Sequence, residues 1–227
     1  GWSEIHDQYR GTALQNYLAD LEEGDLTVAR KPQYVDRIPD RFSGNTNDLL
    51  SRVDERDAAE EIVERLDIAA VVDQDIDTLS GGELQRVALA ATLVRDADFY
   101  FLDEVTPYLD IGQRVTAARL IRELAEEEDR SMMVVEHDLA ILDLIADTLH
   151  VAYGEPGAFG VVTSPKSTRN GINEYLAGYL DNENMRIRPE AIEFEQHAPR
   201  AAATGAAETL VEYPDLVKSY GEGEFTL

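Results

Sequence analysis

The sequence predicts an α/β protein built on a mostly parallel sheet flanked by helices. Two observations support this prediction. Short apolar segments at 26–30, 99–102 and 132–135 have the length of buried strands, and helix-like patterns lie between them. Strands that alternate with helices of this length favour parallel pairing through helical crossovers. Polar side chains follow these apolar segments, and the carboxyl ends of parallel strands meet at one edge of a sheet, where ligands bind.

The elements follow one another in a regular order along the chain. Helical periodicity predicts helices at 3–23 (two short helices broken at Arg10-Gly11), 54–68, 80–95, 113–127 and 138–146. Beyond the three apolar segments, strands are expected at 148–153 and 159–162, on either side of a turn at 154–157. The helical pattern over 171–180 then fades, and a strand-like piece follows at 209–213.

Length and composition exclude several classes of protein. The 227 residues are enough for one to two domains, and none of them is cysteine. These residues therefore hold no disulfide framework, thiolate zinc site or iron–sulfur cluster. The apolar runs are too short to cross a bilayer, and the first residues lack the pattern of a signal peptide. We expect a soluble, cytoplasmic chain with no membrane partner.

The charge of the chain is strongly acidic. With 46 acidic and 20 basic residues the formal net charge is −26, and only Lys31, Lys166 and Lys218 among the cations are lysines. Carboxylates spread over the whole length with scarce lysine are typical of halophilic proteins, although an ordinary acidic protein is the alternative. Such a surface repels nucleic acid at low salt, so composition alone argues against an RNA partner.

The segment Leu79-Ser-Gly-Gly-Glu-Leu-Gln85 opens the helix predicted at 80–95. A serine and two glycines at a helix start leave backbone N–H groups and the positive end of the helix dipole open to an anion. Serine is also a common N-cap, so an ordinary capped helix is the simpler interpretation of this segment alone.

Chemically useful side chains follow the three apolar strands. Asp103 and Glu104 end the second strand, and such a pair can hold Mg²⁺ and orient a water for attack on a phosphate. His137 follows the third strand and Gln33 follows the first. Each residue alone has a structural alternative, because acids and histidines at such junctions often cap helices or turns.

The order and spacing of these motifs resemble the ATP-binding cassette (ABC) ATPases. The resemblance implies an ABC-type nucleotide-binding domain of the P-loop NTPase fold, with an α-helical signature subdomain at 54–95 and with ATP and Mg²⁺ as cofactors. It assigns catalytic roles to Glu104, His137 and Gln33, and Mg²⁺ contacts to Asp103 and Gln33. The contacts to ATP implied for the signature motif and the D-loop are those of Ser80, Gly81, Gly82, Glu83 and Asp110.

Further segments resemble one subfamily, the subfamily E ATPases or RNase L inhibitor family. These segments include Tyr9-Arg10-Gly11, Lys31-Pro-Gln-Tyr-Val-Asp36, Tyr153-Gly-Glu-Pro-Gly157 and Glu183-Asn-Met-Arg186. This resemblance implies ATP-driven ribosome splitting, with the ribosome and its small subunit, a termination factor and a second cassette as partners. It also implies a first cassette at 1–180, with a helix–loop–helix insertion at 3–23. A hinge at 181–197, a linker at 198–207 and the start of a second cassette at 208–227 would follow. The acidic, lysine-poor composition predicts a haloarchaeal source.

The sequence departs from the family at two places. No G-x-x-x-x-G-K-[ST] phosphate loop (Walker A) occurs in the 227 residues, and Val105-Thr106-Pro107 replaces the usual Pro-Ser-Ser. The family carries a phosphate loop and a cysteine-rich iron–sulfur domain before the point that matches Gly1. We therefore expect an internal fragment that does not hydrolyse ATP alone. The alternatives are the ATPase subunit of an ABC transporter and a non-catalytic ribosome-docking module; the matches at 31–39 and 153–162 disfavour the transporter.

Overall fold

The structure, a computed structural model, describes residues 1–12, 14–24, 26–127, 130–193, 219–220 and 225–226. The chain divides into two compact units, residues 1–190 and 191–227. In the second unit the described residues form one antiparallel pair, β10 (Ser219–Tyr220) with β11 (Phe225–Thr226). All other elements belong to the first unit.

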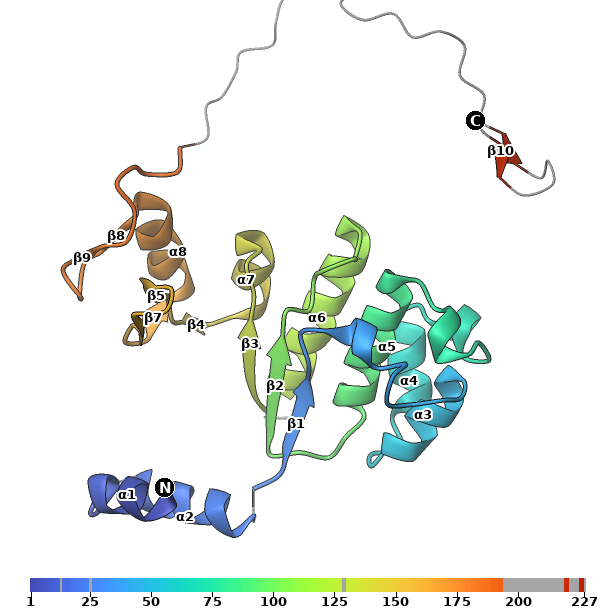
Figure 1. Cartoon of the computed structure of the whole chain (residues 1–227), viewed down its shortest axis with the longest axis horizontal. Coiled ribbons are helices and arrows are strands. Elements are labelled where there is room, and N and C mark those ends of the chain that lie inside the picture. The colour runs from blue at the N-terminus through green and yellow to red at the C-terminus, as the bar shows by residue number, and fades with distance from the viewer. Residues whose placement is uncertain (13, 25, 128–129, 194–218, 221–224, 227) are drawn as a thin grey trace, which may run out of the picture. The chain divides into compact units, whose positions relative to one another are not determined.

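The first unit alternates helices with short strands (Figure 1). Its helices are α1 (Trp2–Tyr9), α2 (Leu14–Glu23), α3 (Thr46–Val53), α4 (Ala59–Arg65), α5 (Gly81–Leu93), α6 (Ile111–Glu127), α7 (Leu139–Ile145) and α8 (Thr168–Ala177). Its strands are β1 (Val28–Lys31), β2 (Phe99–Asp103), β3 (Ser131–Val135), β4 (Thr148–Leu149), β5 (Ala152–Glu155), β6 (Phe159–Val162), β7 (Lys166–Ser167), β8 (Tyr179–Leu180) and β9 (Met185–Arg186).

The central sheet has the order β1-β2-β3, and both pairings are parallel, which confirms the predicted α/β class. Alternate residues of each strand point to the same face. On one face Ala29, Tyr100 and Leu102 are buried, and they form one core with apolar side chains of α5, α6 and α7. On the other face Val28, Met133 and Val135 are 46%, 48% and 37% exposed. A parallel sheet is usually covered on both faces, so this apolar face is a notable exposed surface.

The helical subdomain is confirmed, but it begins earlier than expected. Helix α3, which the sequence analysis did not predict, starts at the cap Asn45, whose side chain accepts a hydrogen bond from the Asp48 amide at 2.7 Å. The helix predicted over 54–68 is shortened to α4, since Asp57 and Asp67 adopt positive φ values of 55° and 51°. Asp54 lies outside this helix and accepts hydrogen bonds from the amides of Ala58 and Ala59 at the start of α4.

The predictions for the C-terminal part of the first unit were partly wrong. Residues 148–153 are not one strand: β4 pairs with β7 and β5 pairs with β6, all antiparallel, in two-stranded sheets separate from the parallel sheet. The pattern over 171–180 belongs to α8, which ends three residues earlier because Gly178 adopts a left-handed conformation (φ +73°) and stops it. The linker at 198–207 and the strand-like piece at 209–213 lie outside the described residues.

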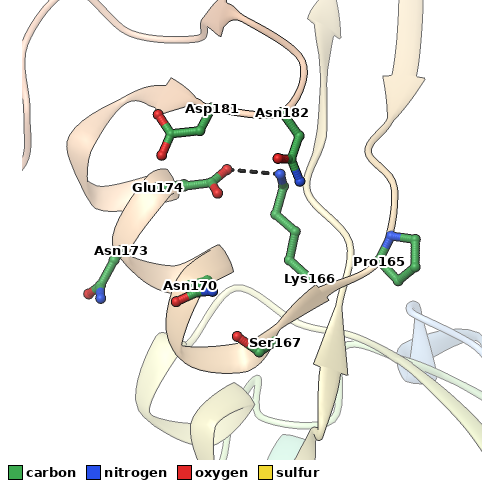
Figure 2. A pocket seen from close by; sticks show the side chains of 8 residues that line it. All are labelled: Pro165, Lys166, Ser167, Asn170, Asn173, Glu174, Asp181 and Asn182. Carbon is green, nitrogen blue, oxygen red and sulfur yellow. Dashed lines mark ion pairs between the residues drawn. The ribbon is translucent and has the colours of Figure 1, made fainter.

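A buried lysine, Lys166 of β7, links α8 to the turn between β8 and β9. The Lys166 ammonium lies 2.9 Å from carboxylate oxygens of both Glu174 on α8 and Glu183 in the β8–β9 turn. Figure 2 shows Lys166 extended toward Glu174. Both residues line a polar pocket of about 560 Å³. The hydrogen bond to Glu183 raises the pKa of Lys166, and the same bond lowers the pKa of Glu183. The β8–β9 hairpin is therefore attached to α8 by charge.

We expect Lys166→Met to loosen the β8–β9 hairpin, because it leaves two carboxylates facing each other without a cation. Amide hydrogen exchange of residues 179–186 should accelerate while exchange in α6 stays unchanged. In the chain without substitutions, the same loosening is expected at acidic pH. It develops as the pH falls below about 4.5, the usual pKa of a glutamate, and through the lowered pKa of Glu183, because protonation removes the charge that pairs with Lys166.

The matched control is the triple variant Lys166→Met, Glu174→Gln and Glu183→Gln, which removes the repulsion together with the attraction. It should recover most of the protection of the hairpin. Equal exchange in the hairpin of Lys166→Met and of the unchanged chain would contradict this interpretation.

Candidate active site at the carboxyl edge of the sheet

The ends of the three parallel strands bring the predicted site residues to one edge of the sheet. Lys31 pairs in register with Leu102, and Asp103 pairs with Val135. The segments that follow these positions contain Gln33, Glu104 and His137. Parallel pairing is the reason that residues about seventy positions apart in the sequence meet here.

Two side chains converge on one oxygen of Glu104. The Gln33 side-chain amide donates a hydrogen bond of 2.6 Å to Glu104 Oε1, and His137 Nε2 lies 3.3 Å from the same oxygen. The Glu104 side chain is 20% exposed, whereas that of His137 is 80% exposed. The structure thus brings together the three residues predicted to be catalytic, with the carboxylate partly sheltered and the imidazole open to solvent.

The backbone of Glu104 is strained. Its φ of +49° lies in the left-handed region, which typically costs a non-glycine residue about 1–3 kcal/mol and which clusters at functional sites. Its amide donates to the Val135 carbonyl at 2.9 Å. Its carbonyl accepts two hydrogen bonds, from Gln85 Nε2 at 2.7 Å and from Lys31 Nζ at 2.8 Å. Both backbone polar groups of this residue are therefore fixed by neighbouring elements.

Lys31 is a functional candidate that the sequence analysis missed. Its side chain is fully buried and also donates to the carbonyls of Pro32 and Asp103, at 3.1 and 3.0 Å. Burial lowers the pKa of Lys31 to about 8, although nearby carboxylates oppose this shift. Gln85, also fully buried, was noted only as the end of a motif. For Lys31, the feature of the sequence that indicates a role is its position: it is one of three lysines and lies at a strand end, two residues before Gln33.

The signature segment begins α5 as predicted. Ser80 caps the helix, and its hydroxyl and amide donate to the Glu83 carboxylate at 2.6 and 2.8 Å. These hydrogen bonds from Ser80 lower the pKa of Glu83. A Cβ on Gly82 would lie 2.9 Å from the Tyr108 carbonyl oxygen, and one on Gly81 would lie 3.1 Å from the Tyr108 ring. Glycine is needed here because the segment before α6 approaches the helix start closely.

That segment, the D-loop, is ordered by its own hydrogen bonds. Asp110 and Gln113 exchange hydrogen bonds of 2.9 and 3.2 Å at the start of α6. Arg114 donates to the Leu109 carbonyl and to Asp138, each at 3.0 Å. Tyr108 lies against Gly81 and Gly82 of the signature segment, and Asp110 follows it in the D-loop, whereas Gln33 and His137 contact Glu104. The predicted site residues therefore form two neighbouring clusters rather than one.

The segment 105–107, where the sequence differs from the family, makes polar contacts with the histidine segment. Both the amide and the hydroxyl of Thr106 donate to the Glu136 carboxylate, directly before His137. Val105 is fully buried. The link to the histidine segment is therefore made by Thr106.

The site fits a magnesium ion that arrives with a nucleotide. Mg²⁺ is usually held by one or two protein oxygen donors, with waters and phosphate oxygens completing its shell. The Asp103 carboxylate is partly exposed and makes no hydrogen bond to another described residue, and the Gln33 amide lies at the same edge. In the described part of the chain no group of three or more His, Cys, Asp or Glu residues could hold a metal alone.

Comparison with known proteins shows the family to which the chain is similar. The family model for ABC transporters matches residues 6–107. An uncharacterised ABC transporter ATP-binding protein of Methanocaldococcus jannaschii is 47% identical over 197 residues, which are 87% of this chain and 32% of that protein. A crystal structure of the archaeal ribosome recycling factor aABCE1 with the archaeal ribosomal stalk protein aP1 matches with 52% identity and a TM-score of 0.84, covering 97% of this chain and 42% of the other. A model of ribosome-bound archaeal Pelota and ABCE1 matches with 50% identity and a TM-score of 0.85, covering 100% and 37%.

The parallel sheet, the signature helix and the motifs at the sheet edge define a domain of the ABC ATPases. Within this class the chain belongs to subfamily E, the RNase L inhibitor family, as the sequence resemblance implied. The chain spans 32%, 37% and 39% of the length of three of its curated relatives. Among the described residues no helix is long and apolar enough to span a membrane.

The strain at Glu104 can be measured by a matched pair of substitutions. Glu104→Gly and Glu104→Ala both remove the side-chain contacts, but only glycine adopts a positive φ without a steric penalty. We expect the free energy of unfolding of the Gly variant to exceed that of the Ala variant by about 1 kcal/mol. Urea denaturation followed by circular dichroism measures this difference, and an equal or higher stability of the Ala variant would contradict it.

Proposed function

We propose that the chain is the first cassette of a cytoplasmic twin-cassette ATPase that couples ATP binding and hydrolysis to ribosome splitting. The observation that carries the proposal is the convergence of Gln33 and His137 on one oxygen of Glu104. The similarity to an archaeal ribosome recycling factor supports the ribosomal part. In this proposal the cassette covers 1–180, a hinge 181–197, a linker 198–207 and the start of a second cassette 208–227.

The residues around Glu104 have separate roles in hydrolysis. Glu104 would accept a hydrogen bond from the attacking water and orient it, while Gln33 keeps the carboxylate in place. His137, open to solvent, would donate to a γ-phosphate oxygen. Asp103 and Gln33 would hold Mg²⁺, which neutralises the charge of the phosphates when it is bound.

The signature cluster faces a different nucleotide. Gly81 and Gly82 place their backbone N–H groups at the start of a thirteen-residue helix, a suitable anion site. The Ser80 hydroxyl lies at the same helix start and donates to Glu83. We propose that this end of α5 binds the γ-phosphate of ATP held by an opposing cassette, with Glu83 holding Ser80 in place. Asp110, beside the same cluster, would couple the two sites. Two nucleotides would then favour the closed state of the cassettes, and hydrolysis would release it.

In a full-length protein that carries this chain, Glu104→Gln should lower kcat for ATP about a hundredfold or more with little change in KM, because only the orientation of the water is lost. Steady-state phosphate release measures this effect. The 227-residue chain alone should show no hydrolysis, since these residues contain no phosphate loop to hold the β- and γ-phosphates.

Unchanged kcat in the Glu104→Gln protein would contradict the assigned role. Hydrolysis by the isolated chain that Glu104→Gln abolishes would contradict the second expectation. Asp143, an exposed aspartate on α7 that is not among the predicted site residues, provides the matched control as Asp143→Asn.

A non-catalytic docking role is supported by a separate observation. Helices α1 and α2 bury none of their residues, and Trp2, Ile5, Leu14 and Tyr17 stay exposed. The two helices are joined by a 2.5 Å contact of His6 with Glu22. We propose that this helix–loop–helix docks on the small ribosomal subunit, and that a termination factor is a further partner.

The acidic surface sets a condition for ribosome binding. Repulsion between this surface and RNA is screened within about 3 Å at 1 M salt, so binding would depend on local contacts of single arginines. Arg10 is exposed, and Arg186 lies over the Tyr179 ring at 5.7 Å. Arg188 lies over the Tyr175 ring at 5.3 Å. We propose that these three residues contact the ribosome in a haloarchaeal cytoplasm.

Ribosome co-sedimentation of the full-length protein should persist in multimolar KCl. Arg186→Gln should weaken it roughly fivefold through one lost phosphate contact, whereas Arg119→Gln, an exposed arginine on α6, should leave it unchanged. Binding at low salt only would contradict the halophilic interpretation, and equal effects of the two variants would contradict the assigned contact.

A further inference from the structure

The carbonyl oxygen of Glu104 is held by two buried side chains from different elements. Gln85 donates from α5 at 2.7 Å, and Lys31 donates from the end of β1 at 2.8 Å. Gln85 is 1% exposed and Lys31 is fully buried. Neither side chain forms a hydrogen bond with the Glu104 carboxylate. Lys31 acts on it through space as a nearby charge, and both side chains hold its backbone carbonyl.

The burial of these two side chains is unfavourable by itself. Gln85 Oε1 is buried and has no hydrogen-bond partner among the described residues, which typically costs more than an apolar side chain of the same size would. Lys31 is a buried cation whose hydrogen-bond acceptors are carbonyl oxygens rather than carboxylates. A role in stability alone would favour methionine or leucine at both positions.

The strained residue explains why these donors are present. Glu104 needs neighbouring groups to hold its left-handed backbone, and its amide already uses the Val135 carbonyl. If the carbonyl were released, the peptide could rotate toward an ordinary strand conformation. The carboxylate would then leave Gln33 and His137, because its direction depends on the backbone.

We infer that Gln85 and Lys31 are positioning residues that hold the Glu104 peptide in its left-handed conformation and so aim the carboxylate at Gln33 and His137. Gln85 lies five residues after Ser80 on the same helix, so α5 connects the signature cluster directly to the Glu104 peptide. This inference rests on the proposed role of Glu104, but it concerns the backbone and can be tested without hydrolysis.

Amide hydrogen exchange of the 227-residue chain tests the inference directly. Gln85→Met and Lys31→Met should each accelerate exchange of the Glu104 and Val105 amides about tenfold or more, while the amides of α6 keep their protection. Lys31→Arg retains the donors and should restore most of the protection. Thr92→Val is the matched control, since Thr92 is buried on the same helix but donates to the Ala88 carbonyl.

A local increase in both methionine variants, absent in Thr92→Val, supports the inference. Unchanged exchange at Glu104, or an equal increase over the whole chain, overturns it, because the second result indicates a merely structural role.

A measurement on the unchanged chain covers the case in which the methionine variants do not fold. An ammonium held by three carbonyls exchanges its protons slowly, so the Lys31 ¹⁵Nζ resonance should be visible at neutral pH, with a correlation to the carbonyl carbon of Glu104. Absence of the resonance overturns the inference. In the full-length protein, Gln85→Met should lower kcat about tenfold at unchanged KM for ATP, whereas Thr92→Val should leave both unchanged.

Discussion

The left-handed backbone of Glu104 is the constraint on which the site depends. Strand β2 ends at Asp103, and the chain must then turn so that the next carboxylate faces Gln33 and His137 instead of continuing along the strand. This turn requires a φ of +49°, which an isolated glutamate avoids. Hydrogen bonds from Lys31 and Gln85 to its carbonyl, and from its amide to Val135, hold it there. Packing of β1, β3 and α5 around β2 brings these three groups together.

The same core determines how the two functional clusters are related. Helix α5 is buried along most of its length, while its first residues emerge beside the D-loop. The close approach of Tyr108 leaves no room for a side chain at Gly82. The D-loop continues into α6, where Arg114 reaches Asp138 at the start of α7. Signature segment, D-loop and histidine segment are thus linked by short contacts across the carboxyl edge.

Particular residues show how far sequence reasoning reached. The helix start at Ser80 and the strands ending at Asp103 and Val135 were predicted because caps, glycines and apolar runs act locally. Helix α3 was missed although Asn45 and Asp48 form a capping pair, since its apolar stripe is short. Strand 148–153 was predicted as one element, but Val151 bonds to Thr163 and the strand divides. Lys31 and Gln85 were overlooked because they bind a backbone carbonyl. Every residue has this group, so no side-chain pattern in the sequence marks the contact.

The sequence by itself determined the fold class, the family and the identity of the motif residues, because periodicity, capping and motif spacing depend on neighbours along the chain. The tertiary structure alone decided which of those residues share a site. It placed Gln33 and His137 on one oxygen of Glu104 and packed Tyr108 of the D-loop against Gly81 and Gly82. It also gave Lys31 and Gln85 a common acceptor. These contacts join residues nineteen to seventy-three positions apart, and only the register of parallel strands and the burial of α5 bring them within hydrogen-bond distance.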